Sequence, residues 1–167
     1  MWQPEEFLEF LKGRRSIRSF ENEEINEEHL KMILEAARWT PSASNRQPWH
    51  FIVIKDKEKL QKISDTAIYG KFFKRAPLAI AIVGKPSESP NWYKVDTSLV
   101  SMQMILMAWA LGIGSCWIGS MDREKAKELL GIDKQDYLLT VLPFGYIKGN
   151  IPKPTLRKSL SQIIERI

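Results

Sequence analysis

The stretch from Leu99 to Ile118 contains no charged residue, and this feature limits the possible folds of the chain more than any other. Its length would suffice to cross a bilayer, so a membrane-spanning helix is one interpretation. Glycine and serine residues interrupt its last third, however, and no basic cluster or aromatic belt flanks it. We therefore expect a core helix, followed by a loop and a short strand, rather than a membrane span.

The expected core helix covers Leu99 to Leu111, where one serine and one glutamine are the only polar residues. Apolar side chains on nearly every side are typical of a helix that is buried on most faces. The side chains of Asp96 to Ser98 are N-cap candidates, and Gly112 and Gly114 would end the helix because glycine tolerates left-handed backbone. In the SCWIGS segment that follows, Gly119 would let the backbone approach a flat ligand.

Length and composition are typical of a soluble globular protein. A chain of 167 residues with 44% apolar and 27% charged residues can form a single domain, here expected to span residues 1–167. The net charge of +5 favours an anionic partner, such as a phosphate-bearing ligand. Nucleic acid is the competing explanation, but the 25 basic residues are scattered among 20 acidic ones and no recognition motif appears. We therefore expect no binding of nucleic acid.

Cysteine and histidine are scarce in this chain. The single cysteine, Cys116, excludes an intramolecular disulfide and lies in an apolar run typical of a buried small side chain. Together with two histidines it supplies too few ligands for a zinc site, so we expect no metal. The acidic N-terminus lacks the basic-then-apolar order of a signal peptide, and a cytoplasmic location is the resulting expectation.

The periodicity of the apolar residues, with breaks at glycine and proline, predicts several helices and strands along the chain. The sequence contains no internal repeats. The predicted helices cover residues 4–12, 25–38, 56–67 and 123–130, and the predicted strands cover residues 50–54, 78–84 and 137–146. At the C-terminus, apolar side chains between Leu156 and Ile167 share one face. This stripe needs a surface to cover, either in its own subunit or in a partner.

The segment Arg14 to Phe20, RRSIRSF, concentrates arginines and serines. Guanidinium forks and hydroxyl groups bind phosphate well, so the segment is a candidate anion site. A solvated basic turn that pairs with nearby glutamates is an equally valid interpretation of these residues alone.

The loop Pro41 to Trp49, PSASNRQPW, carries small polar side chains between two prolines. Serine, asparagine and glutamine offer donors and acceptors without charge, which suits a heterocycle with alternating polar atoms. The alternative is an ordinary turn whose side chains bond their own backbone.

The order of three motifs, RRSIR, PSASNRQPW and GIGSCWIGS, resembles that of the FMN-dependent nitroreductase family. The resemblance covers almost the whole chain, and the later LPFGY motif and basic tail also fit it. It implies an α+β fold in which helices flank a mixed sheet and a long buried central helix. It also implies an intertwined homodimer with FMN bound at the subunit interface.

The resemblance implies roles for particular residues at the phosphate, ribityl and flavin ends of FMN. Arg14 and Ser16 would hold the phosphate and the ribityl chain, and Arg157, together with Lys153, would complete the phosphate site. Arg18 would reach the pyrimidine edge of the flavin, where a cation favours the reduced, anionic ring. The remaining residues implied to bind the cofactor are Arg15, Ile118 and Gly119, with the Gly119 amide facing flavin N5.

The polar loop would contact the flavin that is bound mainly by the other subunit. The residues implied there are Pro41, Ser42, Ala43, Ser44, Asn45 and Gln47. Ala43 stands where the family often has a second serine, so one polar contact would be missing. The loop from Lys85 to Tyr93 is too short for the helical lid of larger members.

The function implied by the resemblance is an NAD(P)H-dependent oxidoreductase. A nicotinamide would pass hydride to flavin N5, and a nitroaromatic or a quinone would then take the electrons. No side chain need act as a nucleophile, so no catalytic residue is predicted beyond the support of Arg18 and Gly119. The alternative is a non-catalytic FMN carrier or sensor; a reductive dehalogenase or flavin-fragmenting enzyme would need a lid or substrate loop that is not evident. Four aromatic residues could line the substrate site or simply pack: Phe72, Phe73, Trp92 and Tyr93.

Overall fold

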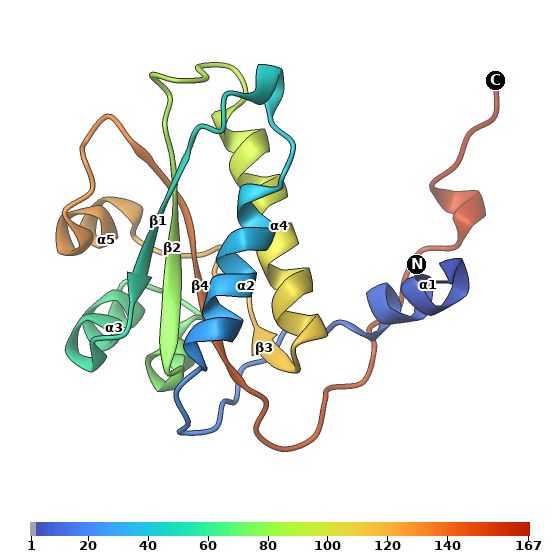
Figure 1. Cartoon of the computed structure of the whole chain (residues 1–167), viewed down its shortest axis with the longest axis horizontal. Coiled ribbons are helices and arrows are strands. Elements are labelled where there is room, and N and C mark those ends of the chain that lie inside the picture. Colours follow the sequence, from blue (N-terminus) through green and yellow to red (C-terminus); the bar gives the residue numbers. More distant parts are fainter. Residues whose placement is uncertain (1–2) are drawn as a thin grey trace.

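A four-stranded antiparallel sheet with helices on both faces forms the body of the protein (Figure 1). The computed structural model describes residues 3–167. The strands, in the spatial order β1-β2-β4-β3, are β1 (Trp49–Ile54), β2 (Leu78–Gly84), β3 (Ile113–Ser115) and β4 (Tyr137–Tyr146). The helices are α1 (Pro4–Gly13), α2 (Glu27–Arg38), α3 (Lys57–Asp65), α4 (Tyr93–Ala110) and α5 (Arg123–Leu130). Short 3-10 turns cover Ala43–Asn45, Lys71–Arg75 and Leu160–Gln162.

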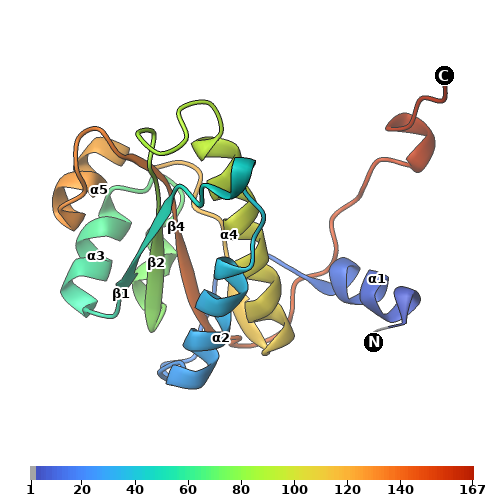
Figure 2. The ribbon, with the colours of Figure 1, turned by 45° about the horizontal axis from the view of Figure 1, so that its top comes forward.

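Helices α2 and α4 cover one face of the sheet, and α3 and α5 cover the other (Figures 1 and 2). The first core contains the buried faces of α2 and α4 with alternate residues of β2 and β4. The second core contains α3, α5 and the other residues of the same two strands. The predicted α+β class is therefore confirmed. The sheet itself is antiparallel, and the parallel pairing recorded for the described residues is the isolated bridge between Ser16 and Ser115.

Strand β2 is buried along its whole length, as its uninterrupted apolar run predicts. It pairs with β4 through a register shift: Ile82 faces Thr140, whereas Val83 faces Leu138. Leu139 is therefore an extra residue in β4, which makes this position a β-bulge.

Helix α4 begins at Tyr93, earlier than the sequence predicts. Asp96, Thr97 and Ser98 consequently lie inside the helix, and the prediction that they cap it is wrong. The Asp96 carboxylate instead accepts a hydrogen bond from the Ala43 amide, with a donor–acceptor distance of 3.3 Å. The Asp96 amide donates to the Trp92 carbonyl oxygen over 2.8 Å, so helical hydrogen bonds already run through this turn.

The two glycines after α4 have different roles. Gly112 has a φ of +73°, which confirms the predicted left-handed residue at the end of the helix. Gly114 lies in β3, so its predicted role in ending the helix is wrong. A Cβ at this position would lie 2.7 Å from Ile17 Cβ, so glycine is needed for close packing.

The burial expected for α4 is found on only one side of the helix in the single chain. Its opposite face exposes large apolar side chains, namely Trp92 just before the helix and Val95, Leu99 and Met102 within it. Among residues 3–167, no helix is both long enough and apolar enough to cross a membrane.

Helix α1 and the C-terminal tail extend away from the body (Figures 1 and 2). No residue of α1 is buried, and every residue from 151 to 167 is exposed. Residues 3–167 therefore do not cover the apolar stripe of the tail, whose exposed members are Leu156, Leu160, Ile163, Ile164 and Ile167.

Candidate functional site

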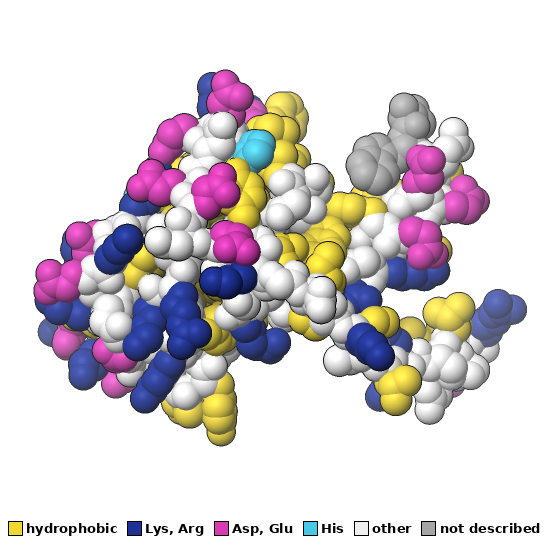
Figure 3. All heavy atoms as spheres, turned by 90° about the horizontal axis from the view of Figure 1, so that it is seen from below, with side chains coloured by type: hydrophobic (Ala, Val, Ile, Leu, Met, Phe, Trp, Pro, Cys, Tyr) yellow, Lys and Arg dark blue, Asp and Glu magenta, His cyan; other side chains and the backbone are white. Residues whose placement is uncertain are grey.

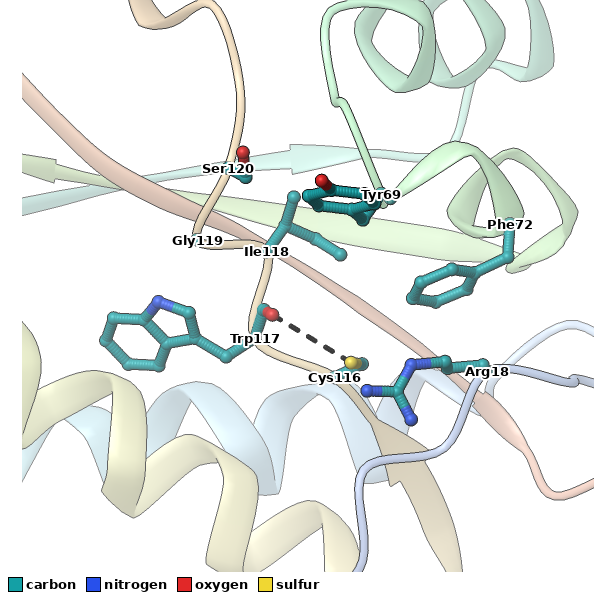
Figure 4. A pocket seen from close by; sticks show the side chains of 9 residues that line it. Arg18, Tyr69, Phe72, Cys116, Trp117, Ile118, Gly119 and Ser120 are labelled. Carbon is teal, nitrogen blue, oxygen red and sulfur yellow. Dashed lines mark hydrogen bonds between the residues drawn. The ribbon is translucent and has the colours of Figure 1, made fainter.

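A pocket of about 100 Å³ lies where the loop after β3 meets the N-terminal segment and the turn after α3 (Figure 4). The loop supplies one wall of the pocket through residues 116–120. The other lining residues are Arg18, Tyr69, Gly70 and Phe72. In Figure 4, the side chains of Arg18, Tyr69 and Phe72 lie around the pocket, whereas the Trp117 indole points away from them.

The RRSIR segment reaches this pocket because it runs beside β3. The Ile17 amide donates to the Ser115 carbonyl oxygen over 2.9 Å, and Ser16 forms a parallel bridge with Ser115. Ile17 is buried against Gly114, so the segment cannot shift without losing that packing. Arg18 is thereby placed at the edge of the pocket.

Gly119 forms an open part of the pocket wall. A Cβ added there would meet only Trp117 Cδ1, at 3.9 Å, and Gly119 is not among the residues with positive φ. Packing within the chain therefore does not require glycine at this position. Its amide has no hydrogen-bond partner elsewhere in residues 3–167. An exposed backbone amide beside open space fits a flat ligand that lies against the loop.

The aromatic residues divide between the pocket and the core. Phe72 lines the pocket together with Tyr69, whose residue surface is 84% exposed. Phe73 is fully buried in the second core. Tyr93 packs edge-on against Tyr137, with ring centroids 5.5 Å apart. Only the first two of these rings are therefore available to a ligand in this pocket.

A second cavity, of about 720 Å³, lies between the end of α1 and the C-terminal tail. Arg15 joins these segments: its Nε donates to the Pro152 carbonyl oxygen over 3.1 Å, and its Nη1 donates to that of Lys12 over 2.6 Å. Figure 3 shows α1 and the tail as separate projections, with Lys and Arg side chains where they leave the body. The cavity is lined by Glu9, Leu11, Lys12, Gly13, Arg14, Arg15, Pro154, Thr155 and Arg157.

The arginines of this cavity repel one another. Burial lowers the pKa of the Arg14 guanidinium below its ordinary value, and the charges of Arg15 and Arg157 lower it further. None of the three takes part in the salt bridges recorded for the described residues, and the Glu9 carboxylate pairs with Lys12 instead. A phosphate would supply the missing negative charge and acceptor oxygens.

Cys116 lies in the wall of the first pocket and is only 5% exposed, which confirms the predicted buried side chain. Burial raises the pKa of its thiol, while Arg18, a hydrogen bond with Ser16 and Arg14 act in the opposite direction. The thiol therefore stays protonated in the folded protein at neutral pH.

The polar loop is strained. Ser44, Asn45 and Gln47 have φ values of 52°, 54° and 52°, in the left-handed region that favours glycine. Ser42 Oγ accepts a hydrogen bond from the Gln47 amide over 2.9 Å, so this side chain bonds its own loop, as the alternative interpretation proposed. Ser44 and Asn45 are exposed.

The polar loop and the RRSIR segment lie at opposite ends of α4. The loop contacts Asp96 in the first turns of the helix. At the other end, a Cβ on Gly13 would lie 3.6 Å from Trp109 Nε1. Thirteen residues separate these two contacts, which corresponds to about 20 Å of helix.

One chain therefore brings together only part of the predicted site. Around the two cavities lie Arg14, Arg15, Arg18, Ile118, Gly119 and Arg157, with Ser16 on the segment that joins them. The residues placed at the far end of α4 are Pro41, Ser42, Ala43, Ser44, Asn45 and Gln47. Lys153 is exposed and does not line the cavity.

Gly70 is a lining residue that sequence reasoning missed. A Cβ there would lie 2.8 Å from Ala67 Cβ and 3.0 Å from Ile118 Cγ2, so glycine lets the turn pack against the loop. A glycine in a turn between a helix and a strand is common. Its sequence context therefore carries no signal of a site.

Comparisons of the sequence and of the structure with known proteins match the chain to the same group of reductases. The profile of the Nitroreductase family matches residues 11–69 and 64–146. The chain is 39% identical over 151 residues to "Putative NADH dehydrogenase/NAD(P)H nitroreductase" of Archaeoglobus fulgidus, covering 86% of this chain and 87% of that one. It is 27% identical over 145 residues to the FMN reductase (NAD(P)H) of Bacillus subtilis, covering 87% of this chain and 56% of that protein. The solved structure of an FMN-dependent nitroreductase from Clostridium difficile has a TM-score of 0.86 and 30% identity, covering 95% of this chain and 98% of that one.

Proposed function

The chain belongs to the nitroreductase family, and from that premise we propose that it is an FMN-dependent oxidoreductase that takes electrons from NAD(P)H. Relatives named for FMN and NAD(P)H support both assignments. The FMN would supply a ring that accepts hydride and passes electrons to a second substrate.

One observation carries the proposal: the segment from Arg14 to Arg18 joins the arginine-lined cavity to the pocket beside Gly119. Arg14 lines the first and Arg18 lines the second. Four residues of extended chain span about 13 Å. An elongated ligand with an anionic end and a flat end fits this arrangement, and FMN has both.

Different residues of the chain would bind different parts of FMN. Arg14, Arg15 and Arg157 would hold the phosphate, and Ser16 would bond the ribityl hydroxyl groups. Arg18 would lie at the pyrimidine edge, where its charge stabilises the negative charge of the reduced ring. The backbone at Gly119 would support the ring and keep solvent from one face.

A homodimer would complete the site. Large apolar residues follow a spacing of three and four along one face, beginning just before α4 and continuing within it: Trp92, Val95, Leu99, Met102, Leu106 and Trp109. This heptad-like stripe is typical of a helix that packs against another helix. A second copy would cover it and would bring its own polar loop to the flavin pocket, which a single chain does not do.

The acceptor proposed is a flat oxidised molecule, such as a nitroaromatic compound or a quinone. Tyr69 and Phe72 lie at the mouth of the pocket and could stack on such a ring. A carrier or sensor would bind FMN through the same residues but would not turn over.

Anaerobic spectroscopy of the FMN-loaded protein tests the proposal. NADH or NADPH should bleach the flavin bands, and added nitrobenzene derivative or benzoquinone should restore them over repeated cycles. Flavin bands that persist with both donors would favour the carrier or sensor. A protein that takes up no FMN would overturn the proposed function.

A further inference from the structure

Two side chains from outside the pocket hold consecutive carbonyl groups of its loop. Thr140 Oγ1 donates to the Ile118 carbonyl oxygen over 2.9 Å. Arg123 Nη2 donates to the Gly119 carbonyl oxygen over 3.0 Å. Both peptide units that flank the Cα atom of Gly119 are therefore anchored to other elements, Thr140 in β4 and Arg123 at the start of α5.

The bulge in β4 places these anchors. Thr140 is fully buried, and it is a polar residue in a strand whose neighbouring residues are apolar. The extra residue, Leu139, directs its carbonyl oxygen to the same Arg123 Nη2, at 3.4 Å. Bulges re-aim side chains beside functional sites, and here the bulged strand meets the pocket loop.

The bond from Thr140 determines where the Gly119 amide points. The Ile118 carbonyl and the Gly119 N–H belong to one planar trans peptide, so they point in opposite directions. A carbonyl held against β4 turns the N–H away from the strand. Gly119 lines the pocket, and its N–H has no partner in the part of the chain that the structure describes.

We propose that Thr140 is a positioning residue, which fixes the Gly119 amide as a hydrogen-bond donor toward an acceptor nitrogen of the bound flavin. The inference rests on the proposed function and adds a residue to it. Oxidised flavin carries a ring nitrogen with a free lone pair, and two-electron reduction places a hydrogen on that nitrogen. A fixed N–H therefore binds the oxidised ring more tightly than the reduced ring.

Thr140→Val is the informative substitution, because valine fills nearly the same space without the hydroxyl group. The Ile118 carbonyl would lose its partner, and the peptide could rotate. Thr140→Ser restores a hydroxyl group. Thr97→Val is the matched control: Thr97 is also fully buried, but its hydroxyl bonds the Tyr93 carbonyl within α4.

The test measures the affinities of oxidised and reduced FMN for wild type and the three variants, together with the ¹⁵N–¹H signal of Gly119 without and with FMN. Thr140→Val should raise the dissociation constant of oxidised FMN about tenfold and that of reduced FMN less, so the midpoint potential becomes more positive. The Gly119 signal should move in the FMN-free protein as well. Thr140→Ser should bind within about twofold of wild type, and Thr97→Val should leave the ratio of the two affinities unchanged.

Equal affinities in Thr140→Val and wild type would overturn this inference and leave the proposed function intact. An equal loss for both redox states would also overturn it, because that result shows only a structural role. Wild-type protein that binds no FMN would overturn the proposed function and this inference together.

Discussion

Arg157 in the C-terminal tail lies close enough to Arg14 for its charge to lower the pKa of the Arg14 guanidinium. Neither arginine forms a recorded salt bridge, and Arg14 is half-buried. Cations that are brought together without a counter-charge are typical of a site that binds an anion.

Arg14→Gln should weaken the binding of FMN about tenfold to a hundredfold, because a charge-assisted hydrogen bond to phosphate is lost. Riboflavin, which lacks the phosphate, should bind wild type and variant equally. Fluorescence titration measures both affinities. Arg75→Gln is the control, since Arg75 is exposed and lines neither cavity. If the substitution weakened the binding of riboflavin as much as that of FMN, Arg14 would not act through the phosphate.

Alanine substitutions at two glycines should change different properties: FMN binding for Gly119 and the stability of the fold for Gly114. Gly119→Ala meets only Trp117 Cδ1, at 3.9 Å, so stability should change by less than about 0.5 kcal/mol while FMN binding weakens. Gly114→Ala places a methyl group 2.7 Å from Ile17 and should destabilise the fold by about 1–3 kcal/mol. Chemical denaturation and FMN titration separate the two effects. Unchanged FMN affinity in Gly119→Ala would show that no ligand lies against the loop.

Leu99→Glu should disrupt the proposed dimer. Leu99 is 46% exposed on the apolar stripe of α4, so a carboxylate there costs little in the single chain but would be buried between two copies. Sedimentation velocity should show dimers for wild type and monomers for the variant, with a loss of about 2–4 kcal/mol in association free energy. Lys59→Glu, on exposed α3 surface, is the control. Wild-type protein that sediments as a monomer would contradict the dimer directly.

The raised pKa of Cys116 makes stability depend on pH. The folded protein keeps the thiol proton in a range where the unfolded chain has already lost it. The free energy of unfolding should therefore fall as pH rises from the ordinary cysteine pKa, about 8.5, toward the raised value. Urea denaturation of wild type and Cys116→Ala across pH 7.5 to about 10 measures the difference. Parallel pH profiles for the two proteins would refute this linkage.

Most secondary structure could be predicted from local sequence. The helices predicted at residues 25–38, 56–67 and 123–130 correspond to α2, α3 and α5. Asn26, Asp56 and Asp122 each accept a hydrogen bond from the first turn of the helix that follows. The apolar run of β2 likewise gave the correct strand. The role of Asp96 could not be predicted: the sequence indicates a cap of α4, but the Asp96 carboxylate accepts a hydrogen bond from a loop that is distant in sequence.

The candidate site also contains some features that could be predicted from the sequence and others that could not. RRSIR shows its cationic character in one short motif, so the sequence suffices to nominate it. The anchors Thr140 and Arg123 leave no such signal, because each bonds a backbone carbonyl from a separate element. The strained φ values of the polar loop also have no sequence marker, since Ser44 and Gln47 are not glycines.

A crystal structure of the protein grown with FMN tests the central claim most directly. The account predicts density for the phosphate among Arg14, Arg15 and Arg157, and density for the ring against Gly119. Residues 41–47 of a second copy should lie at the same ring. Density for FMN at another surface, or a site completed by one chain alone, would contradict the account.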